Sequence, residues 1–518
     1  MEKKEQSIFA YVKEHLDADG VYQGNALPDD PTPSLPRPLG SDDAYTYTAD
    51  MPTDMPGAQA VCHMLQAYAE EPSEAARTLL EEALPNILCV GVCDALIELL
   101  SEDEVPQELL PLAEDWLYTS HKRELVKHAV VILGLLGLDK LRSEHSPTLW
   151  QDLLDLGRCE EFTFFVTFAY RVNNIAPQQE LWTLLKCSKG WGRLFALTDI
   201  ECTTEAEEEW VLRHGCEVEI DYVPICLLVM RKGRIMRHLV KKELDHATYN
   251  GCLLAATDFL VMLDRYYIGG DTLGAIDISD IDTEKLLREV LRHAEAYAAE
   301  PQELLPVIHL ASGLQQLITD SNWTALPANV CHELSGRCDK LIYSRDWRDE
   351  INTRLFKADG SVDYTITEFA FELDIDIWDK LFAYLQQQPL ASDLFPYLLA
   401  LDSKRSQKVL NFIEKNINIY TQSERALMIP LKYLETHPGM NIPIITAALT
   451  SMYDWPRGAA SILLEEWGHE QLTPPLRAAL FTARRLSQNP LITMRIDALL
   501  ENKPFNVATM LDQLDGKN

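Results

Sequence analysis

The chain has 518 residues and a formal net charge of −34, from 80 acidic and 46 basic residues. Apolar residues make up 47% of the sequence, a share typical of folded globular proteins. A field of this sign repels phosphate groups, which disfavours both non-specific nucleic-acid binding and docking on anionic membranes. We therefore expect neither a nucleic acid nor a membrane among its partners.

The sequence shows no segment typical of export or membrane anchoring. The most apolar run, residues 129–138, is about half the roughly 20 residues that a membrane-spanning helix needs. The first residues are charged where a signal peptide has its apolar core. The 11 cysteines are dispersed, many of them in apolar helical patterns, which favours reduced and buried thiols over disulfides. We expect a soluble cytoplasmic protein.

The first residues predict a helix followed by an irregular segment. Residues 7–16 are amphipathic, with Ile8, Val12 and Leu16 among the apolar members. Residues 17–57 are rich in proline, a residue that does not fit a helix interior. The prolines of this segment are Pro28, Pro31, Pro33, Pro36, Pro38, Pro52 and Pro56. We expect an N-terminal helix at 1–17 and a proline-rich extended arm at 18–56.

Two interpretations of this arm stay open. It lies over the first helices, or it is a mobile segment that binds a partner. Within it, Tyr45 and Tyr47 alternate with threonines, which indicates a short extended piece.

From residue 57 onward the pattern is helical. Leu109, Leu112, Ala113, Trp116 and Leu117 are spaced to lie on one helix face, and the same spacing recurs around residues 129–136 and 492–500. Strand alternation is almost absent. The exceptions are residues 355–366, which pass through Asp-Gly and predict a small hairpin, and the loop at 268–281.

The stretch 190–226 shows one complete unit of this pattern. A first short helix is followed by a second that opens at Thr204, with Glu207 placed to complete a capping box. Gly215 ends the second helix, and we expect it in the left-handed conformation that glycine accepts.

Such helix pairs recur roughly every 35–45 residues, the period of HEAT and armadillo repeats. One pair cannot bury its apolar face alone, so its neighbours must stack on it. We predict an all-α protein, an α-solenoid of HEAT-like helix pairs in a right-handed superhelix. It would be continuous over 57–518, with a soft boundary near 268–282. A compact helical bundle is the alternative.

Three segments carry a resemblance to known proteins. They are GWGRLFALTDI…EEWVLRHGCE from residue 190, LDIDIW at 373–378 and DWPRGAASILLEEW at 454–467. They resemble the landmarks of a largely uncharacterised group of bacterial helical-repeat proteins, some of which are labelled limonene hydroxylase. The likeness runs from about residue 190 to near the C-terminus. It implies an α-solenoid and brings no catalytic residues with it.

Motifs for catalysis are weak. The chain has no dinucleotide fingerprint, phosphate-binding loop, nucleophile elbow or zinc-protease motif. Two Glu-x-x-His pairs, Glu243 with His246 and Glu466 with His469, have the spacing found in di-iron carboxylate sites. With 13 histidines such pairs arise by chance, and in a solenoid these two would lie far apart. We expect no metal, no cofactor and no catalytic residue.

Two smaller patterns have structural explanations. Cys89 and Cys93 lie one turn apart on an apolar helix, and a zinc site would need two further ligands beside them. Asp374 and Asp376 form a D-x-D pair, which we interpret as acids near a helix N-terminus.

The most unusual local feature is a basic cluster at residues 231–242. Its main members, Arg231, Arg234, Arg237 and Lys241, concentrate positive charge in a strongly acidic chain, and the last three would share a helix face. One interpretation is a solvated face that pairs with the chain's own acids. The other is a docking site for an acidic partner or a phosphate-bearing ligand. Trp191 and Arg193 form a second group of candidate partner-binding residues.

The function that we predict is a non-enzymatic scaffold, whose curved helical surface binds a protein partner. We expect a monomer or a weak homo-oligomer. The alternative is an enzyme, either a small-molecule oxygenase or hydroxylase or a metal-dependent enzyme, built on the same helices.

Overall fold

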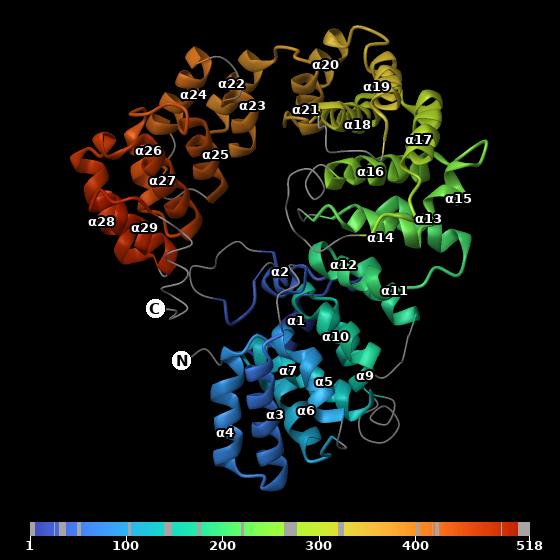
Figure 1. Cartoon of the computed structure of the whole chain (residues 1–518), viewed down its shortest axis with the longest axis vertical. Helices are drawn as coiled ribbons and strands as arrows, with labels where there is room; N and C mark the ends of the chain where they lie inside the picture. Colours follow the sequence, from blue (N-terminus) through green and yellow to red (C-terminus); the bar gives the residue numbers. More distant parts are fainter. Residues whose placement is uncertain are drawn as a thin grey trace. The chain divides into compact units, whose positions relative to one another are not determined.

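The protein is helical throughout its described parts. The computed structural model describes residues 6–24, 26–30, 38–48, 53–101, 105–138, 148–172, 178–218, 222–263, 277–319, 326–399, 403–416, 418–419, 424–487 and 489–505. These residues form helices and no β-strand, which confirms the prediction of an all-α protein (Figure 1). None of the described helices is both long and apolar enough to pass through a bilayer.

The chain divides into two compact units, Met1–Arg345 and Asp346–Asn518. The division does not coincide with the soft boundary expected near 268–282, which falls inside the first unit. Residues 264–276, most of that loop, lie outside the described residues.

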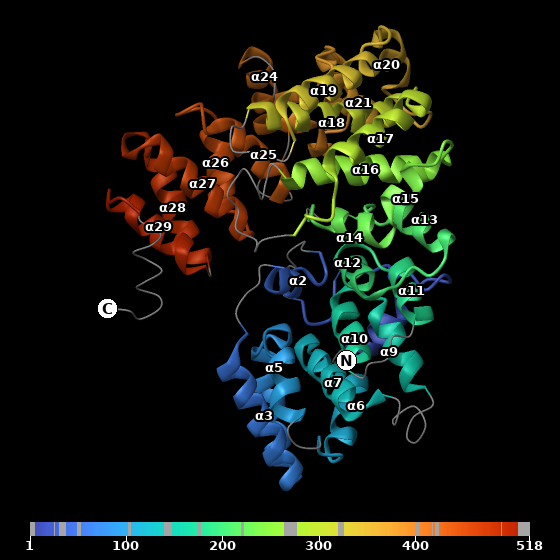
Figure 2. The same cartoon turned by 45° about the vertical axis from the view of Figure 1, so that its right-hand side comes forward.

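The first unit contains two rows of helices (Figures 1 and 2). In one row each helix packs against the next: α3 (Met55–Glu70), α5 (Cys89–Ser101), α7 (Arg123–Leu136), α10 (Glu160–Val172), α12 (Gly190–Asp199), α14 (Ile225–Lys232), α16 (His246–Leu263) and α18 (Pro301–Thr319). The helices between them in sequence pack on this row: α4 (Glu74–Ala83), η1 (Leu84–Asn86), α6 (Leu109–Thr119), α9 (Leu149–Gly157), α11 (Gln178–Cys187), α13 (Glu205–His214), α15 (Ile235–Leu239), α17 (Thr283–Tyr297) and α19 (Ala328–Ile342). α1 (Ile8–Glu14) packs against α6 and α9.

The second unit repeats this alternation. One row consists of α21 (Tyr364–Glu372), α23 (Phe395–Leu399), α25 (Glu424–Leu434), α27 (Asp454–Trp467) and α29 (Pro490–Leu500), each in contact with the next. The remaining elements are α20 (Arg348–Arg354), α22 (Trp378–Gln387), η3 (Ser392–Leu394), α24 (Ser403–Asn416), α26 (Ile442–Leu449), η4 (His469–Gln471) and α28 (Pro474–Leu486).

The apolar spacing explains which helix faces are buried. All five apolar residues that the sequence places on one face of 109–117 are buried in α6. The capping box at α13 is also confirmed, because Thr204 accepts from the Glu207 amide and Glu207 accepts from the Thr204 amide. Gly215 ends α13 as predicted, but its φ of −66° shows that the left-handed expectation was wrong. Glycine is needed there because a Cβ would lie 2.5 Å from Cγ2 of Val229 on α14.

Part of the expected extended arm is helical. α2 (Ser41–Thr48) includes Tyr45 and Tyr47, so the prediction of an extended piece there was wrong. The stretch contains no proline, and Asp42 and Asp43 in its first turn interact favourably with the helix dipole. Pro31, Pro33, Pro36 and Pro52 of the arm lie outside the described residues.

The two units share a local structure near their first helices. After α1, the residues around Ala18-Asp19-Gly20 form a tight turn closed by the bridge Leu16–Tyr22. After α20, Ala358-Asp359-Gly360 does the same, closed by Phe356–Val362, which confirms a hairpin of one bridge. Gly20 and Gly360 have φ of 79° and 82°, so the left-handed conformation is required at both. Ile366, expected in the hairpin, lies in α21.

Candidate functional site

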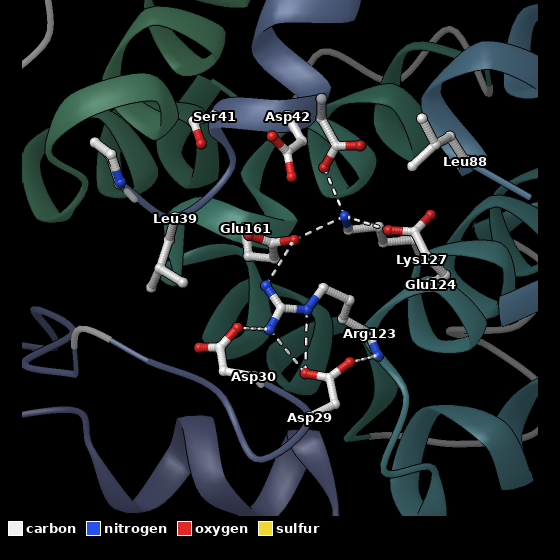
Figure 3. A pocket seen from close by; sticks show the side chains of 12 residues that line it. Asp29, Asp30, Leu39, Ser41, Asp42, Leu88, Arg123, Glu124, Lys127 and Glu161 are labelled. Carbon is white, nitrogen blue, oxygen red and sulfur yellow. Dashed lines mark hydrogen bonds and ion pairs between the residues drawn. The ribbon is translucent and has the colours of Figure 1, made fainter. Parts of the chain in front are cut away.

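A buried lysine is the centre of a strongly charged site in the first unit. Lys127 lies on α7, and only 2% of its side chain is exposed. Its Nζ donates to Asp43 Oδ2 at 2.6 Å, to Glu124 Oε1 at 2.6 Å and lies 2.8 Å from Glu161 Oε1 (Figure 3). These carboxylates come from α2, α7 and α10, so one ammonium joins three elements.

The helix explains why this lysine is buried. α7 is apolar and covered by its neighbours along most of its length, which leaves Lys127 no path to solvent. Glu124 lies one turn earlier on the same face. The ring of Phe165 lies 5.4 Å from Nζ and closes another side of the ammonium.

Arg123 extends the site toward the N-terminal segment. Its guanidinium donates to Asp29 Oδ1 at 2.9 and 3.1 Å, and its backbone amide donates to Asp29 Oδ2 at 2.8 Å. It also donates to Asp30 and lies 3.5 Å from Glu161. We call Asp29, Asp30, Asp43, Arg123, Glu124, Lys127 and Glu161 the ionic cluster.

Backbone amides satisfy the remaining oxygens of two of these acids. The Gly40 amide donates to Glu161 Oε2 at 2.7 Å, and the Cys89 amide donates to Glu124 Oε2 at 2.9 Å. Gly40 has φ of 74°, and a Cβ there would lie 2.7 Å from the Glu160 carbonyl oxygen. Glycine therefore lets the arm come close enough to α10 to make this bond. Asp43 Oδ1 is buried and has no hydrogen-bond partner among the described residues.

Burial and neighbouring charges shift the pKa values of Lys127, Asp43 and Glu161 in the cluster. Burial disfavours the charge of Lys127, but Glu161, Asp43 and Glu124 outweigh it and hold its pKa well above the usual range. Burial raises the pKa of Asp43 to about 7, against the attraction of Lys127. Burial also opposes the charge of Glu161, yet Lys127 and Arg123 leave its pKa lowered. Lys127 therefore stays protonated at neutral pH and is unsuited to act as a base or nucleophile.

A cavity of about 260 Å³ adjoins the ionic cluster, and its lining also includes Leu39, Ser41, Asp42 and Leu88 (Figure 3). Most of the charged groups around it are already paired with one another. What the arrangement does chemically is to hold residues 26–30 and 38–48 against α7 and α10. These contacts favour an arm that lies over the first helices.

The basic cluster does not occupy one continuous helix as expected. α14 ends at Lys232, Gly233 follows, and Arg234 takes a left-handed conformation with φ of 45° before the short α15. The expected helix face through Arg234, Arg237 and Lys241 is therefore wrong, because the chain turns at Gly233.

The side chains of the basic cluster pair with the chain's own acids. Arg231 contacts Asp280 at 2.6 Å. The carboxylate of Glu208 is almost fully buried. Its oxygens lie 2.9 Å from a guanidinium nitrogen of Arg237, 3.0 Å from Nε2 of His238 and 3.4 Å from a guanidinium nitrogen of Arg234. Lys241 pairs with Glu205, and this contact lowers the Glu205 pKa. The interpretation of a self-paired face fits these contacts, and partner docking at this cluster stays a prediction.

The second candidate group has packing roles. The ring of Trp191 lies 5.7 Å from that of Tyr222. Arg193 donates to the carbonyl oxygens of Ser188, His214 and Glu217 at 2.8–3.1 Å, which ties the end of α13 to α12.

The two Glu-x-x-His pairs do not form ligand sets. Glu243 precedes α16, and His246 at its start lies 2.8 Å from Glu303. Glu466 is in α27, but Gly468 ends that helix with φ of 88°, and His469 beyond it contacts Arg477. Neither pair therefore lies within one helix, although its spacing is that of a di-iron motif.

Two other groups of possible metal ligands occur within the described residues. One is Asp43, Glu124 and Glu161, and the other is Glu205, Glu209 and His238. Lys127 lies against all three acids of the first group. In the second, Glu205 pairs with Lys241 and Glu209 with Arg213 at 3.0 Å. Cationic side chains of the protein thus neutralise both groups.

The structure places the two cysteines and the two aspartates that the sequence singled out. Cys89 and Cys93 are buried, and burial raises the pKa of both thiols. Asp376 accepts from the Trp378 amide at the start of α22 at 3.1 Å, as expected of an acid near a helix N-terminus. Asp374 does not, because it lies at the end of α21 with φ of 54°.

Two further cavities lie among the described residues of the second unit. An apolar groove of about 630 Å³ is lined by Pro396, Leu399, Met428, Ile429, Leu431, Lys432, Tyr433, Glu435, Ala459 and Leu463. A cavity of about 330 Å³, which we call the aromatic cavity, is lined by Thr367, Phe371, Asp374, Ile375, Asp376, Ile377, Trp378, Leu381, Tyr397 and Arg405.

Comparison with known proteins gives no relative from which a role can be transferred. No protein-family model, no curated protein and no solved structure matches the chain.

Proposed function

We propose that this chain is a cytoplasmic helical-repeat scaffold that binds a protein partner without catalysing a reaction. The alternation of helices in both units supports a solenoid, because each helix of one row packs on the helix two places further along. This arrangement is also what the resemblance to bacterial helical-repeat proteins implies.

The apolar groove carries the proposal. It lies among α23, α25 and α27, so three successive helices of one row supply its lining. Its volume, about 630 Å³, is within the range of pockets that accept several large apolar groups. On α27 the neighbouring Trp455 and Ile462 are exposed by 64% and 42%, which extends the apolar surface beyond the groove.

The occupant that fits is an amphipathic helix of the partner. Such helices place apolar side chains at i, i+3, i+4 and i+7 into grooves of this kind. Lys432 and Glu435 lie at the groove one helical turn apart, and neither side chain forms an ion pair with another described residue. The partner helix would therefore carry an acidic and a basic residue beside its apolar face.

The rival functions have less support. Nucleic-acid binding needs a basic stripe, whereas Arg231, Arg237 and Lys241 are neutralised by neighbouring acids. The alternative of an oxygenase or a metal-dependent enzyme needs ligand sets that are open to a metal. Both acidic groups found within the described residues contact cationic side chains of the chain itself.

The test is capture of the partner by the full chain with a photo-reactive residue in place of Tyr433. Wild type and the control Leu486→Glu, an exposed apolar residue of α28 that does not line the groove, should capture the same protein. Ile429→Glu should abolish capture, because it places a charge in the apolar groove.

The other outcomes separate the alternatives. Capture by Ile429→Glu equal to that of wild type would reject the groove. Loss of capture in Arg234→Glu/Arg237→Glu alone would assign docking to the basic cluster. Stoichiometric iron or zinc in protein from its own source, lost in His246→Ala or His469→Ala, would favour the enzyme.

A further inference from the structure

The aromatic cavity contains a charge that the protein leaves uncompensated. Arg405 donates to Asp376 Oδ2 at 2.8 Å, and its guanidinium lies 5.2 Å from the centre of the Trp378 ring. This contact lowers the Asp376 pKa, so these two residues neutralise each other. The remaining acidic residue of the lining is Asp374, which is exposed to solvent. Its carboxylate makes no hydrogen bond or ion pair with any other described residue.

The backbone places Asp374 at a position where another residue would be favoured. The Asp374 amide donates to the Phe371 carbonyl and the Ile375 amide donates to the Ala370 carbonyl, the hydrogen bonds of a Schellman motif at the end of α21. Asp374 is the left-handed residue of this motif, with φ of 54°, where glycine or asparagine is preferred. Folding alone does not require a carboxylate at this position.

Aromatic rings form the other wall. Phe371 on α21 is 42% exposed, and its ring lies 5.6 Å from that of Tyr397 on α23, nearly edge to face. The faces of aromatic rings attract cations, and the attraction adds to that of a nearby carboxylate. One unpaired acid beside an aromatic pair in a cavity of about 330 Å³ is suited to an organic cation.

We propose that the aromatic cavity binds an ammonium or guanidinium group, with Asp374 as its counter-ion and Phe371 and Tyr397 as its aromatic wall. The cation is either a free small molecule or the side chain of a lysine or arginine in a peptide. The site is independent of the apolar groove, so either proposal can fail without the other.

The experiment titrates the full chain with tetramethylammonium chloride and follows saturation transfer to its methyl resonance. Sodium chloride at matched ionic strength is the control for non-specific charge effects. Asp374→Asn removes the charge and keeps a residue that tolerates the left-handed conformation, so the fold is preserved. We expect it to weaken binding about tenfold. Phe371→Leu keeps the cavity apolar but removes the ring, and should weaken binding about fivefold.

The matched control is Glu372→Gln, an exposed acid next to the site that does not line the cavity. Its affinity should stay within about twofold of wild type. Equal binding by Asp374→Asn and wild type, or no saturation transfer with wild type, would overturn the proposal. Three further titrations then show whether the natural cation is a free small molecule or a peptide side chain. The ligands are N-acetyl-trimethyllysine amide, arginine amide and free tetramethylammonium. Tighter binding of the amides assigns a peptide side chain, and equal binding assigns a free cation.

Discussion

Replacing Lys127 with methionine is the sharpest test of the ionic cluster. The change keeps the volume of the side chain and removes the ammonium that three carboxylates share at 2.6–2.8 Å. Removing one partner of a buried ion pair costs about 3–5 kcal/mol. Arg123 still faces Glu161 at 3.5 Å, so we expect a loss of about 4 kcal/mol at pH 8.

The loss should depend on pH. Without Lys127 the buried carboxylates take up protons more readily, beginning with Asp43, whose pKa is already raised to about 7. Each pH unit below the pKa of a buried acid then recovers roughly 1 kcal/mol. Wild type itself gains about 1 kcal/mol over this window, because its own Asp43 takes up a proton near pH 7. At pH 6 the destabilisation should therefore be about 1–2 kcal/mol smaller than at pH 8.

Hydrogen exchange measured by mass spectrometry on peptides from α7 and α10 gives the local opening free energy at both pH values. A local measurement is needed because a chain of two units does not guarantee a single unfolding transition. Arg288→Met, which removes an exposed ion pair with Glu333, should leave these peptides unchanged. A loss below about 1 kcal/mol at pH 8, or the same loss at both pH values, would refute a charged and essential Lys127.

Three further predictions follow from the same structure. In Lys127→Ala, one oxygen from each of Asp43, Glu124 and Glu161 lies within 4.8 Å of the others, so these carboxylates should bind Ca²⁺. Millimolar Ca²⁺ should therefore raise the melting temperature of this variant but not that of wild type. Because folding raises the Asp43 pKa from 3.8 to about 7, its stabilising contribution is complete below about pH 4 and is lost as the pH rises through 7. Hydrogen-exchange protection of α2 should fall over this window, and Asp43→Asn should flatten the fall. Gly251→Ala places a Cβ 1.9 Å from the Leu212 carbonyl oxygen and should lower the free energy of unfolding in urea by more than about 3 kcal/mol. Gly336→Ala, whose Cβ would have no atom within 4 Å, should raise it by about 0.5–1 kcal/mol. Equal stability of the two variants would contradict this packing.

The sequence is informative about the helices because their signals are local. The face of α6 and the capping box of α13 depend on residues within one or two turns of each other, and both were confirmed. The same locality explains an error. Tyr45 and Tyr47 alternate with threonines, which predicted an extended piece. The acids at the start of α2 and its packing against α5 instead stabilise a helix.

The ionic cluster could not be predicted because its residues are remote in sequence. Asp43 and Glu161 lie 84 and 34 positions from Lys127, and no periodicity relates them. One local signal was present, since Lys127 interrupts an apolar helical run whose other residues are buried. A lysine in that context predicts a buried charge with partners, although it does not name them.

The basic cluster shows the opposite case. Its charges are plain in the sequence, but their partners, Glu205, Glu208 and Asp280, come from other elements. Placing these residues on one helix face also assumes that the helix continues through Gly233, whereas the chain turns there. Charge patterns thus identify where ions concentrate but not whether they are available to a partner.

The tight turns after α1 and α20 have a consequence for how the chain folds during synthesis. Each is closed by a bridge between residues only six positions apart, Leu16–Tyr22 in one unit and Phe356–Val362 in the other. Hairpins of this kind form in about 1–10 μs, before most distant segments meet. Each unit therefore has its own turn that can form early, and the turn of the first unit can form while the ribosome is still making the second.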